Sequence, residues 1–174
     1  KPAILECRVY RHMAHSTPLF NENHREEDSI DTRREKDSVS RLRKNLIKRV
    51  IEISYKHRLG HLGSCFSALD ILDCIYSVRN PEEPVVLSNG HAGMALYVVL
   101  EKYGFADAEK LFLKHGVHPN RDEEHGISVS TGSLGQGLPI AVGMALSDRN
   151  KSVYCTISDG ECAEGSVWEA LRIA

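Results

Sequence analysis

A chain of 174 residues has the size of a single domain and is long enough to bury a core of its own. Its formal charge of −2 argues against a nucleic-acid or anionic-membrane surface, and its aromatic content of 6% argues against platforms for base stacking. The five cysteines show no paired spacing, no apolar run is long enough to span a membrane, and no signal peptide opens the chain. We therefore expect a cytoplasmic protein that binds neither nucleic acid nor membrane.

The first 37 residues differ from the rest of the chain. Leu5, Cys7 and Val9 alternate with more polar neighbours, which predicts a strand over residues 1–10. Residues 11–37 are polar and charged, and they predict a long ordered loop or a mobile segment. Residues 10–16, Tyr-Arg-His-Met-Ala-His-Ser, resemble a strand-to-loop passage of the α subunit of 2-oxo acid dehydrogenases. That resemblance places His15 beside a cofactor diphosphate; the alternative is a solvated loop whose histidines are incidental.

Amphipathic helices alternate with short apolar runs in the remainder of the chain. Apolar residues at helical spacing predict helices over residues 38–56, 66–78, 91–103, 106–112, 135–146 and 166–174. Apolar runs predict buried strands at residues 85–87 and 152–157, whereas residues 114–131 predict a loop. Basic residues of the first helix are expected to form a solvated face. The alternation is typical of an α/β fold, a doubly wound parallel sheet with helices on both faces.

An acidic, glycine-containing stretch, Ser-Asp-Gly-Glu-Cys-Ala-Glu-Gly, fills residues 158–165 between the last strand and the last helix. Open α/β sheets bind ligands at the carboxyl ends of their strands. Asp159 offers a hard oxygen ligand, Gly160 lets the backbone approach a ligand closely, and a helix start favours phosphate. The stretch therefore predicts a diphosphate bridged by magnesium, and the alternative for Asp159 is a structural turn.

A glycine-rich turn, Thr-Gly-Ser-Leu-Gly-Gln-Gly, opens the helix at residues 131–137. Glycines at such a place let main-chain groups approach a planar ring or a phosphate. They also permit tight helix packing, and both interpretations can hold at once.

Three histidines, His61, His91 and His118, stand beside glycine or proline in loops or at helix starts. Loop histidines near a ligand can donate hydrogen bonds or move protons near neutral pH. For any one of them a surface or satisfied core imidazole is the alternative. A zinc cluster of His115, His118 and His125 is a competing idea, but neither a cysteine pair nor a His-x-x-x-His helix accompanies it.

The order of five motifs, at residues 60–64, 87–92, 116–119, 130–137 and 158–165, resembles the cofactor-binding half of transketolase. The similarity runs from about Arg43 to Ala174 and is closest to the amino-terminal subunit of split transketolases. The resemblance implies thiamine diphosphate and Mg2+ as cofactors, and transfer of a two-carbon ketol unit between sugar phosphates.

The same resemblance implies roles for single residues. His61 and His118 would be catalytic, His61 contacting both substrate and cofactor and His118 the substrate oxygens. Asp159 would bind the metal. Glu164 is also among the cofactor-binding residues, and it would lie near a subunit interface that couples two active sites; the alternative is a first-turn glutamate that favours the helix dipole. The remaining cofactor-binding residues implied by the family are His91, Gly132, Ser133, Leu134 and Gly160.

The chain departs from the family pattern in several places. Ser158 replaces the first glycine of the usual Gly-Asp-Gly, and Leu62 replaces the commoner proline after His61. A second metal ligand and the glutamate that activates the cofactor lie, in the family, on sequence beyond this chain. We therefore expect residues 38–174 to form a transketolase-like diphosphate-binding domain that ends before its last strands.

A second subunit carrying a pyrimidine-binding domain would complete the site, in a homo- or hetero-oligomer. Two other interpretations stay open. One is a 2-oxo acid decarboxylating dehydrogenase component, and the other is a non-catalytic scaffold or regulatory subunit of the same fold.

Overall fold

The computed structural model describes residues 38–174, with side chains from Arg43 onward. The chain divides into two units, Lys1–Asn45 and Leu46–Ala174, and the first described helix crosses from one into the other. The strand predicted at residues 1–10, the polar loop at 11–37 and His15 lie outside the described residues, and they stay predictions.

Helices outnumber strands among the described residues. In chain order the α-helices and strands are α2 (Ser38–His57), α3 (Leu62–Val78), β1 (Val85–Leu87), α4 (Gly93–Lys102), α5 (Ala108–His115), α6 (Gly137–Ser147), β2 (Tyr154–Thr156) and α7 (Gly165–Ile173). Short 3-10 turns lie between them: η1 (Gly90–Ala92), η2 (Glu123–His125) and η3 (Gly160–Ala163). None of these helices is long and apolar enough to cross a membrane.

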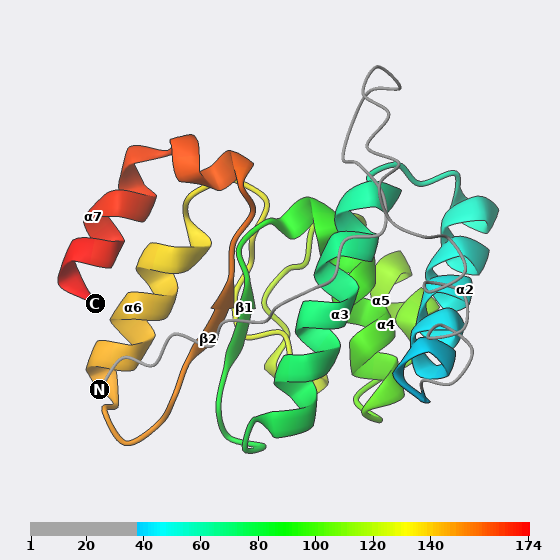
Figure 1. Ribbon diagram of the computed structural model, residues 1–174, viewed down its shortest axis with the longest axis horizontal. Helices are drawn as coiled ribbons and strands as arrows, with labels where there is room; N and C mark the ends of the chain where they lie inside the picture. The colour runs from blue at the N-terminus through cyan, green and yellow to red at the C-terminus, as the bar shows by residue number, and fades with distance from the viewer. Residues whose placement is uncertain (1–37) are drawn as a thin grey trace, which may run out of the picture. The chain divides into compact units, whose positions relative to one another are not determined.

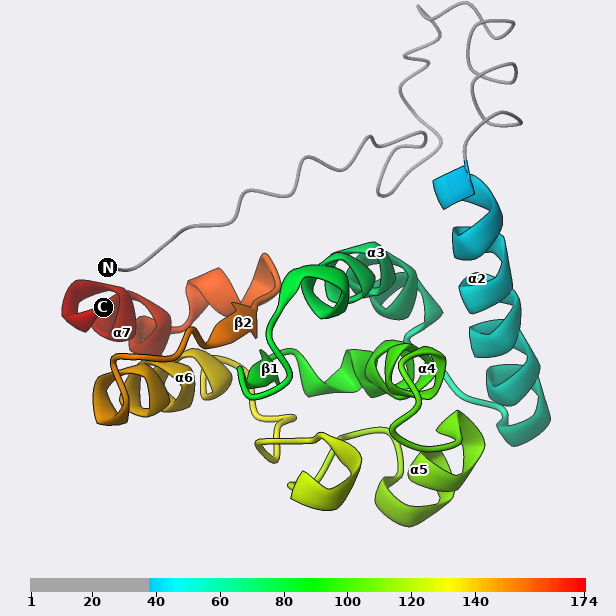
Figure 2. The ribbon, with the colours of Figure 1, turned by 90° about the horizontal axis from the view of Figure 1, so that it is seen from below.

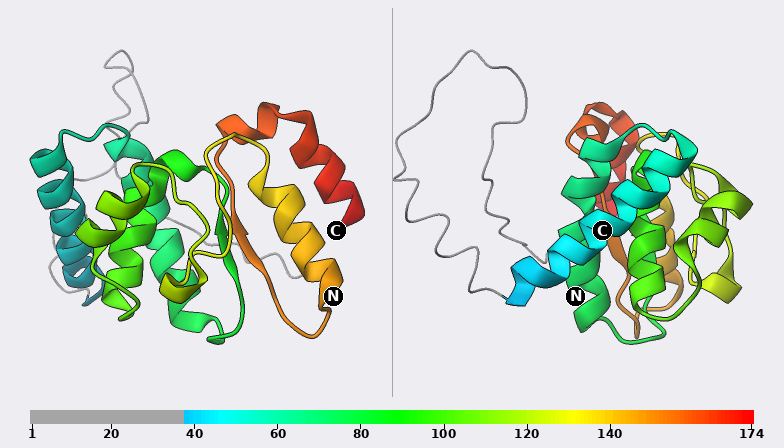
Figure 3. Two further views of the ribbon diagram at one scale, coloured as in Figure 1. Left: turned by 180° about the vertical axis from the view of Figure 1, so that it is seen from behind. Right: turned by 90° about the vertical axis from the view of Figure 1, so that its right-hand side faces the viewer.

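The sheet consists of β1 and β2, paired in parallel with Val85 opposite Tyr154 and Leu87 opposite Thr156. Helices α3 and α4 lie on one face of the strand pair, and α6 and α7 lie on the other (Figures 1 and 2). The view from behind shows the same separation (Figure 3). The predicted α/β class with helices on both faces of a parallel sheet is confirmed.

The core is centred on α4, which is apolar all round. Every residue of this helix from Gly93 to Leu100 is buried, as expected for a helix that other elements cover on all sides. The helix begins with glycine because a side chain on Gly93 would collide with the Val117 carbonyl oxygen. Tyr97 is also buried, and its hydroxyl donates to the Gly116 carbonyl at 3.1 Å, so the loop after α5 is tied to α4.

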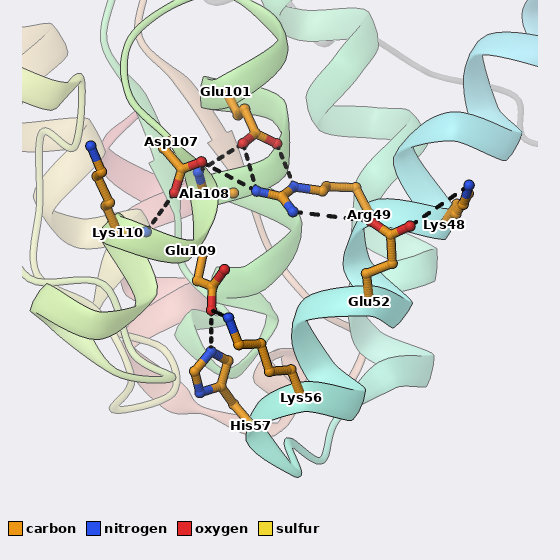
Figure 4. A network of polar contacts seen from close by, with 10 residues as sticks. All are labelled: Lys48, Arg49, Glu52, Lys56, His57, Glu101, Asp107, Ala108, Glu109 and Lys110. Carbon is orange, nitrogen blue, oxygen red and sulfur yellow. Dashed lines mark hydrogen bonds and ion pairs between the residues drawn. The ribbon is translucent and has the colours of Figure 1, made fainter.

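Ion pairs join α2 to α4 and α5 (Figure 4). Arg49 donates through Nε and Nη2 to the Glu101 carboxylate, both at 2.9 Å, and through Nη2 to Asp107 at 3.2 Å. Farther along the helix, His57 lies 2.7 Å from Glu109. The predicted solvated basic face of this helix is thus wrong at Arg49, whose side chain is only 31% exposed because it spans to two other helices.

Most predicted elements are present with shifted ends. Residues 85–87 form a strand as predicted, and the strand predicted at 152–157 is shorter, Tyr154–Thr156. Helix α3 begins at Leu62, four residues before the predicted start, and α5 runs from Ala108 to His115. The loop predicted at 114–131 includes the last two residues of α5, the turn η2 and an isolated antiparallel bridge between Asp122 and Ile127.

Candidate functional site

The carboxyl ends of β1 and β2 lie at the same edge of the sheet because the strands are parallel. Residues 88–92 follow β1, and residues 158–164 follow β2. Open α/β sheets bind ligands at the carboxyl ends of their strands, where loops follow the strands. A ligand site is therefore expected at this edge.

The glycine-rich turn before α6 reaches the same edge. A side chain on Gly90 would come within 2.6 Å of the Gly132 nitrogen, and one on Gly137 would come within 2.5 Å of Ser88 Oγ. Glycine is required where these backbones touch. Gly132 itself has φ of 147°, a conformation that residues with a side chain rarely adopt. The motif after β1 and the motif before α6 are therefore packed against each other.

Three predicted histidines gather beside this contact. The rings of His61 and His91 lie 5.1 Å apart between centroids, and the His118 ring lies 3.1 Å from the place where Gly132 would carry a Cβ. Burial lowers the pKa of His91, and the neighbouring His61 and His118 lower it further, whereas Glu161 opposes them. His91 is therefore neutral at pH 7 and is able both to donate and to accept a hydrogen bond.

None of these three rings is hydrogen-bonded to another residue in the described part of the chain. His61 and His118 are exposed, and His91 is half-buried. Their ring nitrogens are therefore available to a ligand.

His61 also holds an uncommon backbone conformation. It precedes α3 with φ of 59° and ψ of 23°, in the left-handed region that residues other than glycine seldom occupy. Its carbonyl accepts from the Cys65 nitrogen at 3.1 Å, which helps to hold the turn in place. Strain of this kind persists only where surrounding structure maintains it, and it concentrates at functional sites.

The glycine-rich turn presents exposed side chains from Ser133 and Leu134. The Thr131 hydroxyl just before them is buried and bonds to none of the described residues. An unpaired buried hydroxyl is costly unless something pairs with it. It is consistent with a polar ligand at this turn.

The acidic stretch after β2 contributes two exposed carboxylates. Asp159 and Gly160 lie at the start of η3, and Asp159 bonds to no other side chain in the described region. Glu164 lies against the glycine-rich turn, since a Cβ on Gly135 would come within 2.6 Å of Glu164 Cβ. Asp159 thus remains free to bind a cation, and Glu164 closes one side of the turn.

The competing zinc cluster is not assembled. His115 Nε2 and His125 Nδ1 lie 3.0 and 2.9 Å from the same oxygen, Asp122 Oδ2. The grouping that could hold a metal among the described residues consists of Asp122, Glu124 and His125, and it does not include His118.

Sequence reasoning misses Glu161. The pattern places it only within the acidic stretch, but its side chain is fully buried and bonded to three segments of the site. Its place two residues after Asp159 is the only signal, and spacing alone does not separate a buried glutamate from an exposed one.

Residues 38–174 match the family described as transketolase, thiamine diphosphate binding domain. The chain is 38% identical over 160 residues to transketolase of Homo sapiens, a match that covers 80% of this chain and 25% of the human protein. It is 38% identical over 144 residues to an apulose-4-phosphate transketolase subunit of Phocaeicola vulgatus, covering 71% of this chain and 50% of that protein.

A third relative, 6-deoxy-6-sulfo-D-fructose transketolase subunit SqwG of a Clostridium species, is 36% identical over 151 residues, covering 75% of this chain and 55% of the relative. The chain thus spans from a quarter to about half the length of these relatives. On this match, and with the α/β fold already described, the chain belongs to the transketolase family, and residues 38–174 correspond to its thiamine diphosphate binding domain.

Proposed function

We propose that this chain is a thiamine diphosphate- and Mg2+-dependent transketolase-like subunit that transfers a two-carbon ketol unit between sugar phosphates. The observation that carries the proposal is the gathering of His61, His91 and His118 beside Gly132, at the carboxyl ends of two parallel strands. Family membership indicates the cofactor class. The unbonded ring nitrogens are groups that can hydrogen-bond to a sugar-phosphate substrate and transfer protons.

The residues at this edge fit a diphosphate held through a metal. Asp159 offers an exposed carboxylate with no competing partner among the described residues, and magnesium prefers such oxygen ligands. The unpaired Thr131 hydroxyl and the close backbone at Gly132 fit a polar group of the cofactor, beside Ser133, Leu134 and Gly160. When bound, thiamine diphosphate supplies the nucleophilic carbon that this chemistry requires.

The histidines would divide the remaining tasks. His91, neutral at pH 7, would donate a hydrogen bond to the diphosphate. His61 and His118 are exposed, and they would hold substrate oxygens and move protons as the carbon–carbon bond breaks and forms.

A second chain would complete the site. Two relatives are named as transketolase subunits, and this chain matches about half of each. We infer a partner that carries the pyrimidine-binding domain, in a homo- or hetero-oligomer, with Glu164 near the interface. Exposed apolar side chains on α7, Trp168, Leu171 and Ile173, agree with a helix that contacts another protein surface.

The test is titration calorimetry of the full chain with thiamine diphosphate, with and without Mg2+. Asp159→Ala should weaken metal-dependent binding by about 10- to 100-fold and leave thermal unfolding unchanged, because an exposed side chain without partners is removed. The matched control is Asp148→Ala at the far end of α6, which should bind like the wild type.

Equal affinity in the Asp159→Ala variant would overturn the assignment of Asp159. Absence of binding by the wild type, both alone and together with a partner that carries the pyrimidine-binding domain, would overturn the proposed function and favour the non-catalytic scaffold. Turnover of a 2-oxo acid with a lipoyl acceptor, in place of a ketose phosphate with an aldose phosphate, would favour the dehydrogenase alternative.

A further inference from the structure

Glu161 is a fully buried carboxylate beside the site, with no cationic partner in the described region. Its Oε1 accepts from Ser88 Oγ at 2.5 Å and from the Gly135 nitrogen at 3.0 Å. Its Oε2 accepts from the Ser158 nitrogen at 2.9 Å and from Ser158 Oγ at 3.2 Å. Four donors therefore surround one side chain that, when ionised, only accepts.

The four donors come from three different segments. Ser88 follows β1, Gly135 belongs to the glycine-rich turn, and Ser158 follows β2. Ser88 Oγ in turn accepts from the Gly137 nitrogen at 3.1 Å, so Glu161 holds the glycine-rich turn twice, once directly and once through Ser88. The Gly135 and Gly137 nitrogens can only donate. Ser88 Oγ therefore accepts from Gly137 and uses its own proton to donate to Glu161.

Each of these segments carries residues of the proposed site. His91 lies three residues after Ser88, Gly132, Ser133 and Leu134 precede Gly135, and Asp159 adjoins Ser158. A change in the carboxylate would therefore shift the imidazole, the turn and the metal ligand relative to one another. Burial of a charge without a cation is expensive, and four well-placed donors are what make it tolerable here.

We propose that Glu161 is a positioning residue of the site, whose carboxylate sets the mutual placement of the loops after β1 and β2 and of the turn before α6. The inference rests on the proposed function for the identity of the ligand, thiamine diphosphate with Mg2+. Glu161 itself does not touch the ligand; it acts through Ser88, Gly135 and Ser158.

The informative substitution is Glu161→Gln, which keeps shape but replaces one acceptor oxygen with an NH2 group. In one orientation the NH2 group faces the Gly135 nitrogen, and in the other it faces the Ser158 nitrogen. Either way one backbone N–H meets a donor and loses its partner. Calorimetry of the full chain should show affinity for thiamine diphosphate with Mg2+ lower by about 10- to 100-fold.

A control separates positioning from general loss of stability. Ile53→Ala removes a buried side chain from α2, a helix that carries none of the proposed site residues, and should lower the thermal midpoint without changing cofactor affinity. Ser88→Ala is the milder companion, because it leaves Glu161 three of its four donors. It should weaken binding by about two- to tenfold, and by much less when Glu161→Gln is already present.

Amide hydrogen exchange gives a readout that needs no ligand. Protection of the Gly135 amide or of the Ser158 amide, whichever faces the new NH2 group, should fall in Glu161→Gln by more than that of the core amides. In Ile53→Ala these two amides should lose no more protection than the core amides do. Wild-type affinity in Glu161→Gln, or equal loss of affinity in Ile53→Ala, would overturn the proposal. A wild type that never binds thiamine diphosphate would instead overturn the proposed function, and the exchange pattern would still report on the bonds of Glu161.

Discussion

Two groups of histidines lie in the same unit and are bonded in opposite ways. In the site group, the rings of His61, His91 and His118 form no hydrogen bond with any described residue. In the Asp122 cluster, defined as Asp122 with Lys114, His115 and His125, all three basic side chains point at one carboxylate oxygen at 2.7, 3.0 and 2.9 Å.

This difference in hydrogen bonding distinguishes a histidine that stabilises the fold from one whose ring nitrogens can bind a ligand. In the Asp122 cluster the side chains of His115 and Asp122 are 5% and 7% exposed, so burial would penalise either group alone. Burial opposes ionisation of Asp122, yet hydrogen bonds from Lys114, His125 and His115 bring its pKa down to about 2. The cluster thus fastens the loop after α5, whereas the site group leaves its nitrogens free for a ligand.

The largest expected effect tests the site group through His118→Asn. In an assay that contains the proposed partner subunit, ketol transfer should fall by about 10²- to 10⁴-fold, because His118 is the group proposed to hold substrate oxygens and to move protons. The free energy of unfolding should change by less than about 0.5 kcal/mol, since the ring is exposed and bonds to no described residue. Steady-state kinetics and urea unfolding of the same preparation measure the two quantities.

His125→Asn is the matched control, with the same substitution on the same loop. It should leave the transfer rate within a few-fold of wild type and should lower stability, because Asp122 loses one donor. The comparison breaks if His125→Asn abolishes transfer, or if His118→Asn unfolds the chain.

A smaller effect is expected from Asp122→Ala, which leaves the buried His115 without its partner. Stability should fall by about 1–3 kcal/mol at pH 7 in urea unfolding, while affinity for thiamine diphosphate stays unchanged. Because the folded pKa of Asp122 is depressed from 3.8 to about 2, its contribution is present above pH 4 and is lost as the pH falls toward 2. The variant should lack that part of the acid unfolding profile; an acid profile identical to wild type would show that the cluster does not stabilise the fold.

Apolar periodicity and glycine spacing predict a helix or strand correctly where neighbouring residues alone determine the local structure. The strand at residues 85–87 and the α/β class follow from apolar runs and helical spacing, and both are confirmed. The early start of α3 at Leu62 escapes the prediction because its preceding residue, His61, gives no side-chain cap and sits in a left-handed conformation. No local sequence pattern predicts a helix start of this kind.

Polar contacts between residues far apart in the chain cannot be predicted from the sequence, for a different reason. Glu161 has donors 73 and 26 residues away, and Arg49 has acceptors 52 and 58 residues away. Whether a charged side chain is buried depends on which of these groups the fold brings together, and one sequence does not contain that information. The resemblance to transketolase names the residues that are proposed to face the ligand, but it does not reveal the side chains that hold them.

The smallest expected effect concerns His91, whose protonation affects stability in a different pH range from that of Asp122. The pKa of His91 is lowered from its ordinary value of 6.5, first by burial, so between 6.5 and the folded value the unfolded chain binds more protons than the folded one. Stability should therefore decline slightly as the pH falls through 6.5, well above the window in which Asp122 acts. Titration of His91 by NMR should give a pKa below 6.5 in the wild type and a still lower one in Glu161→Gln, because the opposing carboxylate charge is gone. An unchanged pKa in that variant would mean that Glu161 lies too far from His91 to influence it, and the imidazoles of the site group and the buried carboxylate would then act independently.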